Sequence, residues 1–386
     1  MKLKLFICCC FISFSLYSQE KFTLSGVISE AASGETLIGV NVLIPELSNG
    51  TATNQYGFYS ITLPAGTYDV FYSNLGFKTE KISIDLTENK TQNFSLLPDT
   101  EALDEVLIKA DIEKLNIRKP QMSVNSLSIS TIKKMPVVLG EVDVIKSITL
   151  LPGVTNAGEG SSGFNVRGGA ADQNLILLDE ATLYNSSHLF GFFSVFNPDA
   201  IKDLTLYKGG IPARYGGRVS SVLDIYQKDG NNKEYHAQGG IGLVASRLLI
   251  EGPIKKEKAS FLVGGRSSYA HLFLPLFDND NVAYFYDLNT KISYNIDPEN
   301  RLYLSGYFGR DVFSIADSFS NSFGNATLNL RWNHLFSEKL FSNLSVIYSD
   351  YFYGLELGFV EFDFESGIRN LNLKYDFTSF LSDDIE

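Results

Sequence analysis

Four histidines are the first residues to consider for acid–base or metal chemistry in this chain. They are His188, His236, His271 and His334, and none lies at metal-ligand spacing from another histidine or a glutamate. The sequence also lacks the G-x-S-x-G turn of a serine hydrolase and the glycine-rich loop that binds phosphate. We therefore predict no catalytic residue, no metal site and no cofactor, and a protein that is not an enzyme.

A second set of polar residues lies in the segments FNVRGGAADQNLILLD and GIPARYGGR. The candidate residues in them are Arg167, Gly168, Gly169, Asp179, Arg214, Gly216, Gly217 and Arg218. An arginine guanidinium can bind a carboxylate at two points, so these arginines suit ion pairs better than catalysis. The nearby segment SSHLFGFFSVFNP could place aromatic rings near a ligand, but burial in a core is the favoured prediction for it.

Several short elements must position these residues. Apolar residues at helical spacing predict a helix over 140–150, which Pro152-Gly153 ends. The runs 163–166, 174–178 and 204–207 predict strands, and 174–178 is apolar throughout, as in a strand buried on both faces. Asn197-Pro198 predicts a helix start, with asparagine as the cap and proline in the first position.

The N-terminus predicts an exported protein. Residues 1–18 combine two lysines with an apolar run and small residues near Ser18, which is the layout of a secretory signal peptide. The alternative is a lipoprotein signal, because Cys8, Cys9 and Cys10 are consecutive, but they lie inside the apolar run. All cysteines of the sequence lie there, so a mature chain would form no disulfide.

Composition narrows the class of protein further. The net charge is −12 and no basic stripe is present, which argues against a nucleic acid partner. Beyond residue 18 no run of 18 or more apolar residues occurs, so we predict no transmembrane helix. A chain rich in tyrosine and phenylalanine can still enter a membrane as β-strands.

Two regions read as β-structure. Residues 19–98 contain six short strand-like runs separated by turn signals, which is typical of a small β-sandwich. Residues 233–386 alternate apolar and polar residues over long runs, for example at 287–296, 327–333 and 370–377. Alternation fits strands with one lipid face and one wet face, and it also fits a soluble sandwich. Charges on the polar face and aromatic residues near the strand ends favour the first interpretation.

These regions resemble a known family. Residues 120–232 resemble the plug domain of TonB-dependent outer-membrane receptors, on FNVRGGAADQNLILLD and NPDAIKDLTLYKGGIPARYGGR. Residues 19–98 are similar to the carboxypeptidase-regulatory-like domain, for which the simplest role is a spacer. One residue departs from the family, because Glu180 stands where a glycine commonly follows the aspartate. The resemblance favours a general receptor branch over SusC-type glycan importers.

The linker, residues 99–119, holds an apolar island. The segment that resembles the TonB box consists of Asp104, Glu105, Val106, Leu107 and Ile108. A short extended segment of this kind can add as a strand to the sheet of a partner. The alternative is a stray strand that packs on the sandwich.

The resemblance implies a receptor and transporter in the cell outer membrane, with its sandwich and plug facing the periplasm or the barrel lumen. Its partners would be TonB with the inner-membrane energising complex, outer-membrane lipid, and a small nutrient such as a siderophore, glycan, vitamin or peptide. The three arginines would either pair with carboxylates on the inner barrel wall or fix the fold of the plug itself.

The expected fold class is mainly β: a Greek-key β-sandwich, an α+β plug domain, and the first strands of an incomplete transmembrane β-barrel. We count about seven barrel strands, whereas large plugged transporters have about 22. The chain is therefore expected to be a fragment with a truncated barrel. The rival hypothesis is a surface adhesin or structural β-protein without transport activity, which would have no plug.

Overall fold

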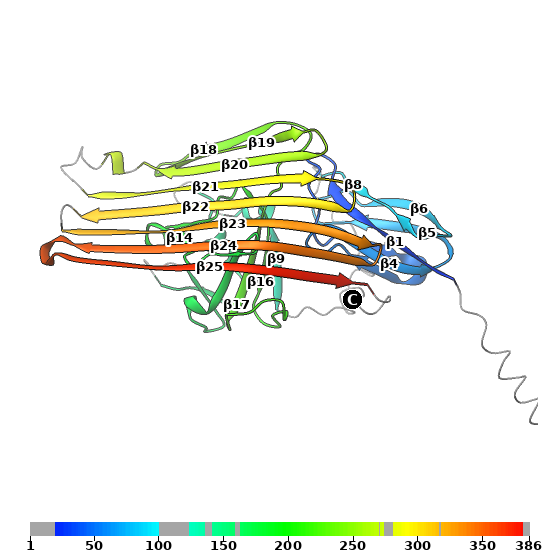
Figure 1. The fold of residues 1–386 in the computed structure, drawn as a ribbon, viewed down its shortest axis with the longest axis horizontal. Coiled ribbons are helices and arrows are strands. Elements are labelled where there is room, and N and C mark those ends of the chain that lie inside the picture. The colour runs from blue at the N-terminus through cyan, green and yellow to red at the C-terminus, as the bar shows by residue number, and fades with distance from the viewer. Residues whose placement is uncertain are drawn as a thin grey trace, which may run out of the picture.

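The computed structural model describes residues 20–99, 123–135, 141–158, 163–269, 271–273, 281–315 and 318–380. The predicted signal peptide (1–18) and the predicted TonB box (104–108) lie outside these ranges. The described chain forms a sandwich, a plug and a long antiparallel sheet, which we call the wall sheet. Figure 1 shows the strands of the wall sheet side by side, with the plug behind and below them and the sandwich at one end.

The N-terminal sandwich has two sheets around one core. One sheet has the order β4-β1-β7, with β8 also paired to β1, and the other has the order β3-β2-β5-β6. The strands are β1 (Lys21–Glu30), β2 (Asn41–Ile44), β3 (Asn49–Ala52), β4 (Phe58–Pro64), β5 (Gly66–Ser73), β6 (Glu80–Leu86), β7 (Lys90–Thr91) and β8 (Phe94–Leu96), and η1 (Pro45–Leu47) follows β2. Leu24 and Tyr59 from one sheet and Val42 and Val70 from the other are buried in the shared core. The predicted sandwich is confirmed.

The plug is built on a five-stranded mixed sheet of order β13-β12-β17-β16-β9. Its strands are β9 (Val124–Ser128), β12 (Asn174–Leu178), β13 (Ala181–Thr182), β16 (Ile201–Tyr207) and β17 (Ser221–Gln227). The pair β12 and β17 is parallel and the other neighbours are antiparallel. Every residue of β17 is buried, because this strand lies in the middle of the sheet and is covered on both faces.

Short elements complete the plug. They are α3 (Ile129–Ile132), α4 (Val144–Ile148), β10 (Val154–Asn156), β11 (Phe164–Val166), η2 (Ala171–Gln173), β14 (Ser187–His188), η3 (Leu189–Gly191) and β15 (Phe193–Ser194). The side chain of Asp143 caps α4 by accepting a hydrogen bond from the Lys146 N–H at 2.9 Å. Ile148 and Phe164 pack with Leu223 in the plug core.

The predicted helix start at Asn197-Pro198 is wrong. The structure has a single turn there, in which the Ala200 N–H donates to the Asn197 carbonyl, and β16 begins at the next residue. The Asn197 side chain accepts a hydrogen bond from the Asp199 N–H at 3.0 Å, as an N-cap would. Asparagine and proline therefore start a turn here, and the strand that follows leaves no room for a helix.

Among the described residues, the wall sheet consists of eight antiparallel strands in sequence order, β18 to β25, and the sequence predicted about seven. They are β18 (His236–Ile241), β19 (Ala245–Lys255), β20 (Ala259–Ser268), β21 (Val282–Asn295), β22 (Asn300–Ile315), β23 (Phe319–Ser337), β24 (Leu340–Leu357) and β25 (Phe362–Ser379), and η5 (Gly358–Val360) lies between the last two. Each strand pairs with the next along the chain, as in a meander.

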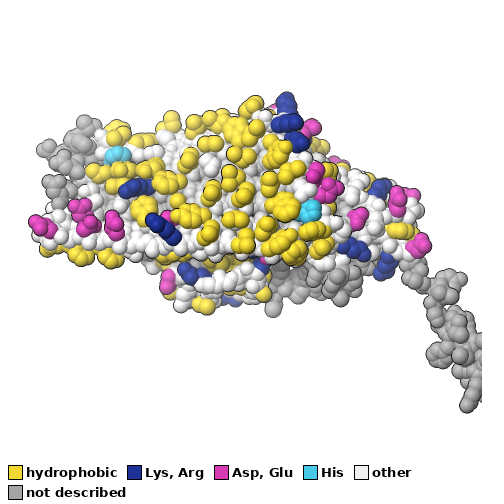
Figure 2. All heavy atoms as spheres, viewed as in Figure 1, with side chains coloured by type: hydrophobic (Ala, Val, Ile, Leu, Met, Phe, Trp, Pro, Cys, Tyr) yellow, Lys and Arg dark blue, Asp and Glu magenta, His cyan; other side chains and the backbone are white. Residues whose placement is uncertain are grey.

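The two faces of the wall sheet have the opposite polarity to those of a soluble protein. In β21, Asp287 and Lys291 are buried, whereas Leu288 and Ile292 are each 43% exposed. Figure 2 shows hydrophobic side chains gathered over the outer face of these strands. The polar face of the middle strands is buried, so the predicted alternation is confirmed there with its polar side toward the plug. Within the described residues, no helix is long and apolar enough to cross a membrane.

Candidate functional site at the interface of plug and wall

Ion pairs join the plug to the wall sheet, and most of the carboxylates come from the plug. Lys291 of β21 lies 3.3 Å from Asp179 and 2.9 Å from Asp229. Arg247 of β19 bridges Glu141 at 2.9 Å and Asp199 at 2.8 Å. Because these groups are buried or nearly so, each charge depends on its partner for stabilisation.

In one contact the cation belongs to the plug and the carboxylates belong to the wall sheet. The plug residue His188 places Nδ1 2.6 Å from Asp311 and Nε2 3.1 Å from Asp287, both on the wall sheet. Its ring stacks on Phe285 at 4.3 Å between centroids. Burial opposes the charged imidazolium, but the carboxylates of Asp311 and Asp287 outweigh burial, and the pKa of His188 is raised. Arg266 also pairs with Asp287, at 2.6 Å. The cluster is therefore an ionic contact between plug and wall.

The corner after β12 carries two adjacent buried carboxylates. Asp179 accepts hydrogen bonds from the Gln227 N–H at 3.1 Å and from the Gln227 side chain at 3.2 Å. Glu180 accepts from Ser345 at 2.5 Å and from Asn343 at 3.0 Å, both in β24. Asp179 therefore holds the corner to β17 of the plug and also pairs with Lys291 of the wall sheet, whereas Glu180 holds the corner to β24 of the wall sheet.

The Arg167-Gly168-Gly169 segment forms a tight turn after β11. Arg167 and Gly168 have φ values of 51° and 81°. A Cβ atom at Gly169 would lie 2.3 Å from the Ser220 hydroxyl, so only glycine fits without a shift. The guanidinium of Arg167 donates to the Ser123 hydroxyl at 2.6 Å. This contact lies inside the plug.

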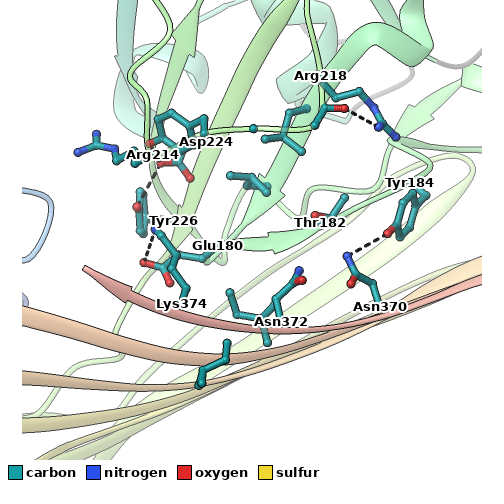
Figure 3. A pocket seen from close by; sticks show the side chains of 17 residues that line it. Glu180, Thr182, Tyr184, Arg214, Arg218, Asp224, Tyr226, Asn370, Asn372 and Lys374 are labelled. Atoms are coloured by element: carbon teal, nitrogen blue, oxygen red, sulfur yellow. Dashed lines mark hydrogen bonds and ion pairs between the residues drawn. The ribbon is translucent and has the colours of Figure 1, made fainter. Parts of the chain in front are cut away.

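The second glycine motif lines a cavity of about 420 Å³ between the plug and strand β25. Figure 3 shows this cavity, with plug side chains on one side and side chains of β25 on the other. Its charged lining residues are Glu180, Arg214, Arg218, Asp224 and Lys374, and Gly216 and Gly217 also line it. Charges of both signs face this space, so polar contacts dominate the lining.

The two arginines of that motif contact their own surroundings. Arg214 donates to the Tyr207 hydroxyl at 3.3 Å, and its guanidinium lies 5.0 Å from the Tyr215 ring centre. Arg218 donates to the carbonyl of Gly217 at 2.8 Å. The hydrogen bonds described for the three selected arginines stay within the plug, as the second of the two interpretations expects. Whether any of them takes part in function stays a prediction.

The residues that sequence reasoning missed belong to the wall sheet. Lys291, Arg247 and Lys374 meet plug carboxylates, and none of them was selected. The available signal was their place on the polar half of the alternating strands, where a charge must find a partner inward. Among the described residues, no group of histidines, cysteines or carboxylates could hold a metal ion.

Family profiles match two parts of the chain. Residues 24–108 match the CarboxypepD_reg-like domain, and residues 116–221 match the TonB-dependent receptor plug domain. A surface adhesin without a plug is therefore excluded. The first match extends over residues 104–108, where the TonB box is predicted, and does not decide the role of that segment.

Curated relatives point the same way. The TonB-dependent receptor SusC of Bacteroides thetaiotaomicron is 26% identical over 239 residues, which cover 58% of this chain and 22% of SusC. The TonB-dependent receptor P39 of Formosa agariphila is 25% identical over 229 residues, which cover 56% and 21%. The chain thus spans about a fifth of the length of these relatives. We predicted a general receptor branch rather than SusC-type glycan importers, and the match to SusC does not support that prediction.

Solved structures share the fold. The siderophore receptor PirA from Acinetobacter baumannii has a TM-score of 0.50 at 17% identity, over 67% of this chain and 45% of PirA. FpvA from P. aeruginosa, bound to heterologous pyoverdines, has a TM-score of 0.51 at 12% identity, over 68% and 40%. At 17% and 12% sequence identity, these structures show a shared fold and nothing about a shared ligand. The chain therefore combines a CarboxypepD_reg-like domain, the plug domain of TonB-dependent receptors and, among the described residues, an eight-stranded antiparallel sheet, and in this combination it is similar to TonB-dependent receptors.

Proposed function

We propose that this protein is an outer-membrane receptor that binds a nutrient at the cell surface and moves it to the periplasm with energy from TonB. The observation that carries the proposal is the plug seated on the polar face of a sheet whose other face is apolar. A sheet with an apolar outer face can lie against membrane lipid. A plug that is held by ion pairs can be released when those pairs break, as a passage that opens requires. The curated relatives are TonB-dependent receptors as well.

The partner TonB would act through the linker before the plug. Val106, Leu107 and Ile108 are the apolar island of that linker, and we propose that they pair with TonB as an added strand. Pairing through main-chain hydrogen bonds requires an extended backbone and tolerates changes of side chain. The nutrient is a siderophore, a glycan, a vitamin or a peptide, and the residues that select it stay unassigned.

A proline substitution tests the role of this segment. Leu107→Pro removes one main-chain donor and fixes φ, so strand pairing with TonB should be lost. Leu107→Val, the matched control, keeps the backbone and should behave like the wild type. Binding of the purified periplasmic domain of TonB to each variant measures the effect directly, and a loss of at least about ten-fold in affinity is expected for the proline variant. Equal affinity of Leu107→Pro and the wild type would refute the assignment.

A cell assay extends the test to transport. Cells that depend on this receptor for growth on one nutrient, chosen by screening siderophores, glycans, vitamins and peptides, should stop growing with Leu107→Pro. Surface binding of the labelled nutrient should stay unchanged, because binding at the surface does not require strand pairing with TonB. Growth at the wild-type rate, together with intact TonB binding, would show that this segment does not couple the protein to transport.

A further inference from the structure

The corner between β12 and β13 has a strained backbone. The two residues of this hairpin loop, Asp179 and Glu180, have φ values of 46° and 71°. Loops with two left-handed residues favour Asn-Gly or Asp-Gly, because glycine carries no Cβ. A glutamate in the second position is strained, and such residues persist where the surroundings hold them firmly. The contacts of Glu180 therefore need an explanation.

Three parts of the protein meet at the Glu180 carboxylate. The sandwich contributes the hydroxyl of Tyr56, which donates to Oε1 at 2.7 Å. The wall sheet contributes Asn343 at 3.0 Å and Ser345 at 2.5 Å, and Lys374 lies 3.7 Å away. Glu180 itself belongs to the plug and is buried. One carboxylate thus joins the sandwich, the plug and the wall.

Tyr56 is held in place for this contact. Its ring stacks on Phe341 of the wall sheet at 5.2 Å, and the Arg331 guanidinium lies 5.1 Å from its ring centre. The neighbouring Gln55 accepts a hydrogen bond from the Tyr226 hydroxyl of the plug at 3.1 Å. The loop before β4 therefore reaches the corner in one defined position.

The charge states suit a donor and an acceptor. Burial raises the pKa of the Tyr56 phenol and the negative charge of Glu180 raises it further, so the phenol keeps its proton. Burial alone would raise the pKa of Glu180, but Lys374, Arg331 and the donated hydrogen bonds together lower it. A phenol that donates to an ionised carboxylate makes a strong, charge-assisted hydrogen bond.

We propose that Tyr56 and Glu180 form a latch, through which the docked sandwich holds the plug corner against the wall sheet. The plug corner stays against the wall sheet while Tyr56 is hydrogen-bonded to Glu180. When the sandwich moves away, this hydrogen bond breaks and the corner becomes more mobile. The sandwich is then a regulator of plug movement in addition to a spacer. Only the biological role of the latch rests on the proposed function, because the contact between Tyr56 and Glu180 forms without TonB and without a nutrient.

Hydrogen exchange of the full-length protein in detergent micelles tests the latch. Tyr56→Phe removes one hydroxyl and keeps the ring that packs on Phe341. The variant should speed exchange of the amides of 174–182 by about ten-fold, because it removes a hydrogen bond to a charged group. The wall strands should exchange at the wild-type rate. Tyr59→Phe is the matched control, since its hydroxyl bonds to Tyr72 and to the Gln92 carbonyl inside the sandwich.

A second variant separates the latch from a general loss of stability. Glu180→Gln removes the charge that Tyr56 binds, so Tyr56→Phe should add less than about two-fold in this background. Faster exchange in Tyr56→Phe alone, and no further increase in the double variant, supports the latch. Exchange of 174–182 at the wild-type rate in Tyr56→Phe overturns it, as does an equal effect of Tyr56→Phe in both backgrounds. These measurements use no TonB and no nutrient, so their outcome is independent of the Leu107→Pro tests.

Discussion

At the scale of single residues, the plug is held to the wall by buried charges whose partners lie far away in the sequence. His188 is the clearest case, because it lies between the carboxylates of Asp287 and Asp311 and its ring stacks on Phe285. Such contacts cost desolvation when they form, and each is strongly destabilising when one partner is removed. They therefore set how firmly the plug is held.

The first prediction concerns the pH dependence of this contact. The groups that face His188 are Asp287, Asp311, Arg266 and Tyr307. Because the pKa of His188 is raised in the folded state, its stabilising effect is complete below its ordinary pKa and is lost as pH rises through the raised value. The melting temperature should fall as pH rises above about 6.5, the ordinary pKa of histidine.

His188→Gln is the variant for this measurement. It should lower the stability by about 3 kcal/mol near pH 6, because Asp311 loses its cation and Asp287 keeps only Arg266. It should also flatten the pH dependence described above. His236→Gln is the matched control, since His236 is exposed at the start of β18. The same slope in His188→Gln and in the wild type would contradict the assignment.

The sequence identified the polar residues of the plug more readily than their partners. Asp179 was selected because it ends an apolar run, and the structure buries it. Lys291, which it meets, is 112 residues further along the chain, and no local pattern links the two. Glu180 was noted only as a departure from the family. Its role as a junction depends on where the sandwich docks, which local sequence does not encode.

At the scale of elements, the strands of the wall sheet were the most predictable part. Their alternation has a period of two, and the structure turns the polar residues toward the plug and the apolar ones outward, as at Asn329 and Leu330 of β23. The turn at Asn197-Pro198 was less predictable. The same two residue types start helices and turns, and the strand β16 that follows decides between them.

The outward face gives a second prediction. Leu330 is 49% exposed on the apolar face of β23. Leu330→Arg should cost about 2–4 kcal/mol if this position lies near the middle of the membrane, and should reduce the amount of protein assembled in outer membranes. Leu330→Ile keeps the apolar face and is the control. The measurement is the yield of heat-modifiable protein in the outer-membrane fraction, and equal yields for the two variants would argue against a lipid-facing position.

At the scale of the whole molecule, the sandwich and the wall sheet depend on their surroundings to different degrees. The sandwich has a core of its own, which includes Leu24, Val42, Tyr59 and Val70. The wall sheet buries polar side chains under the plug and leaves apolar ones exposed, so its outer face needs lipid or detergent.

The third prediction follows from this difference. Residues 19–98, expressed alone, should fold as a monomer with a cooperative melting transition, because an 80-residue β-domain can have its own core. Residues 233–386, expressed alone in buffer, should aggregate or stay unfolded. Circular dichroism and gel filtration of the two pieces provide the measurement. A soluble monomeric form of 233–386 that melts cooperatively would contradict this view of the wall sheet.

The order of the segments along the chain has a consequence for how the protein is made. The plug carboxylates Asp179 and Glu180 precede their wall partners Lys291 and Lys374 in the sequence, so they leave the ribosome first. Until the wall strands are in place, these carboxylates can stay ionised only in contact with water, because their lysine partners are not yet beside them. We expect the last event of assembly to be the loss of that water, when each carboxylate exchanges its hydration shell for a lysine.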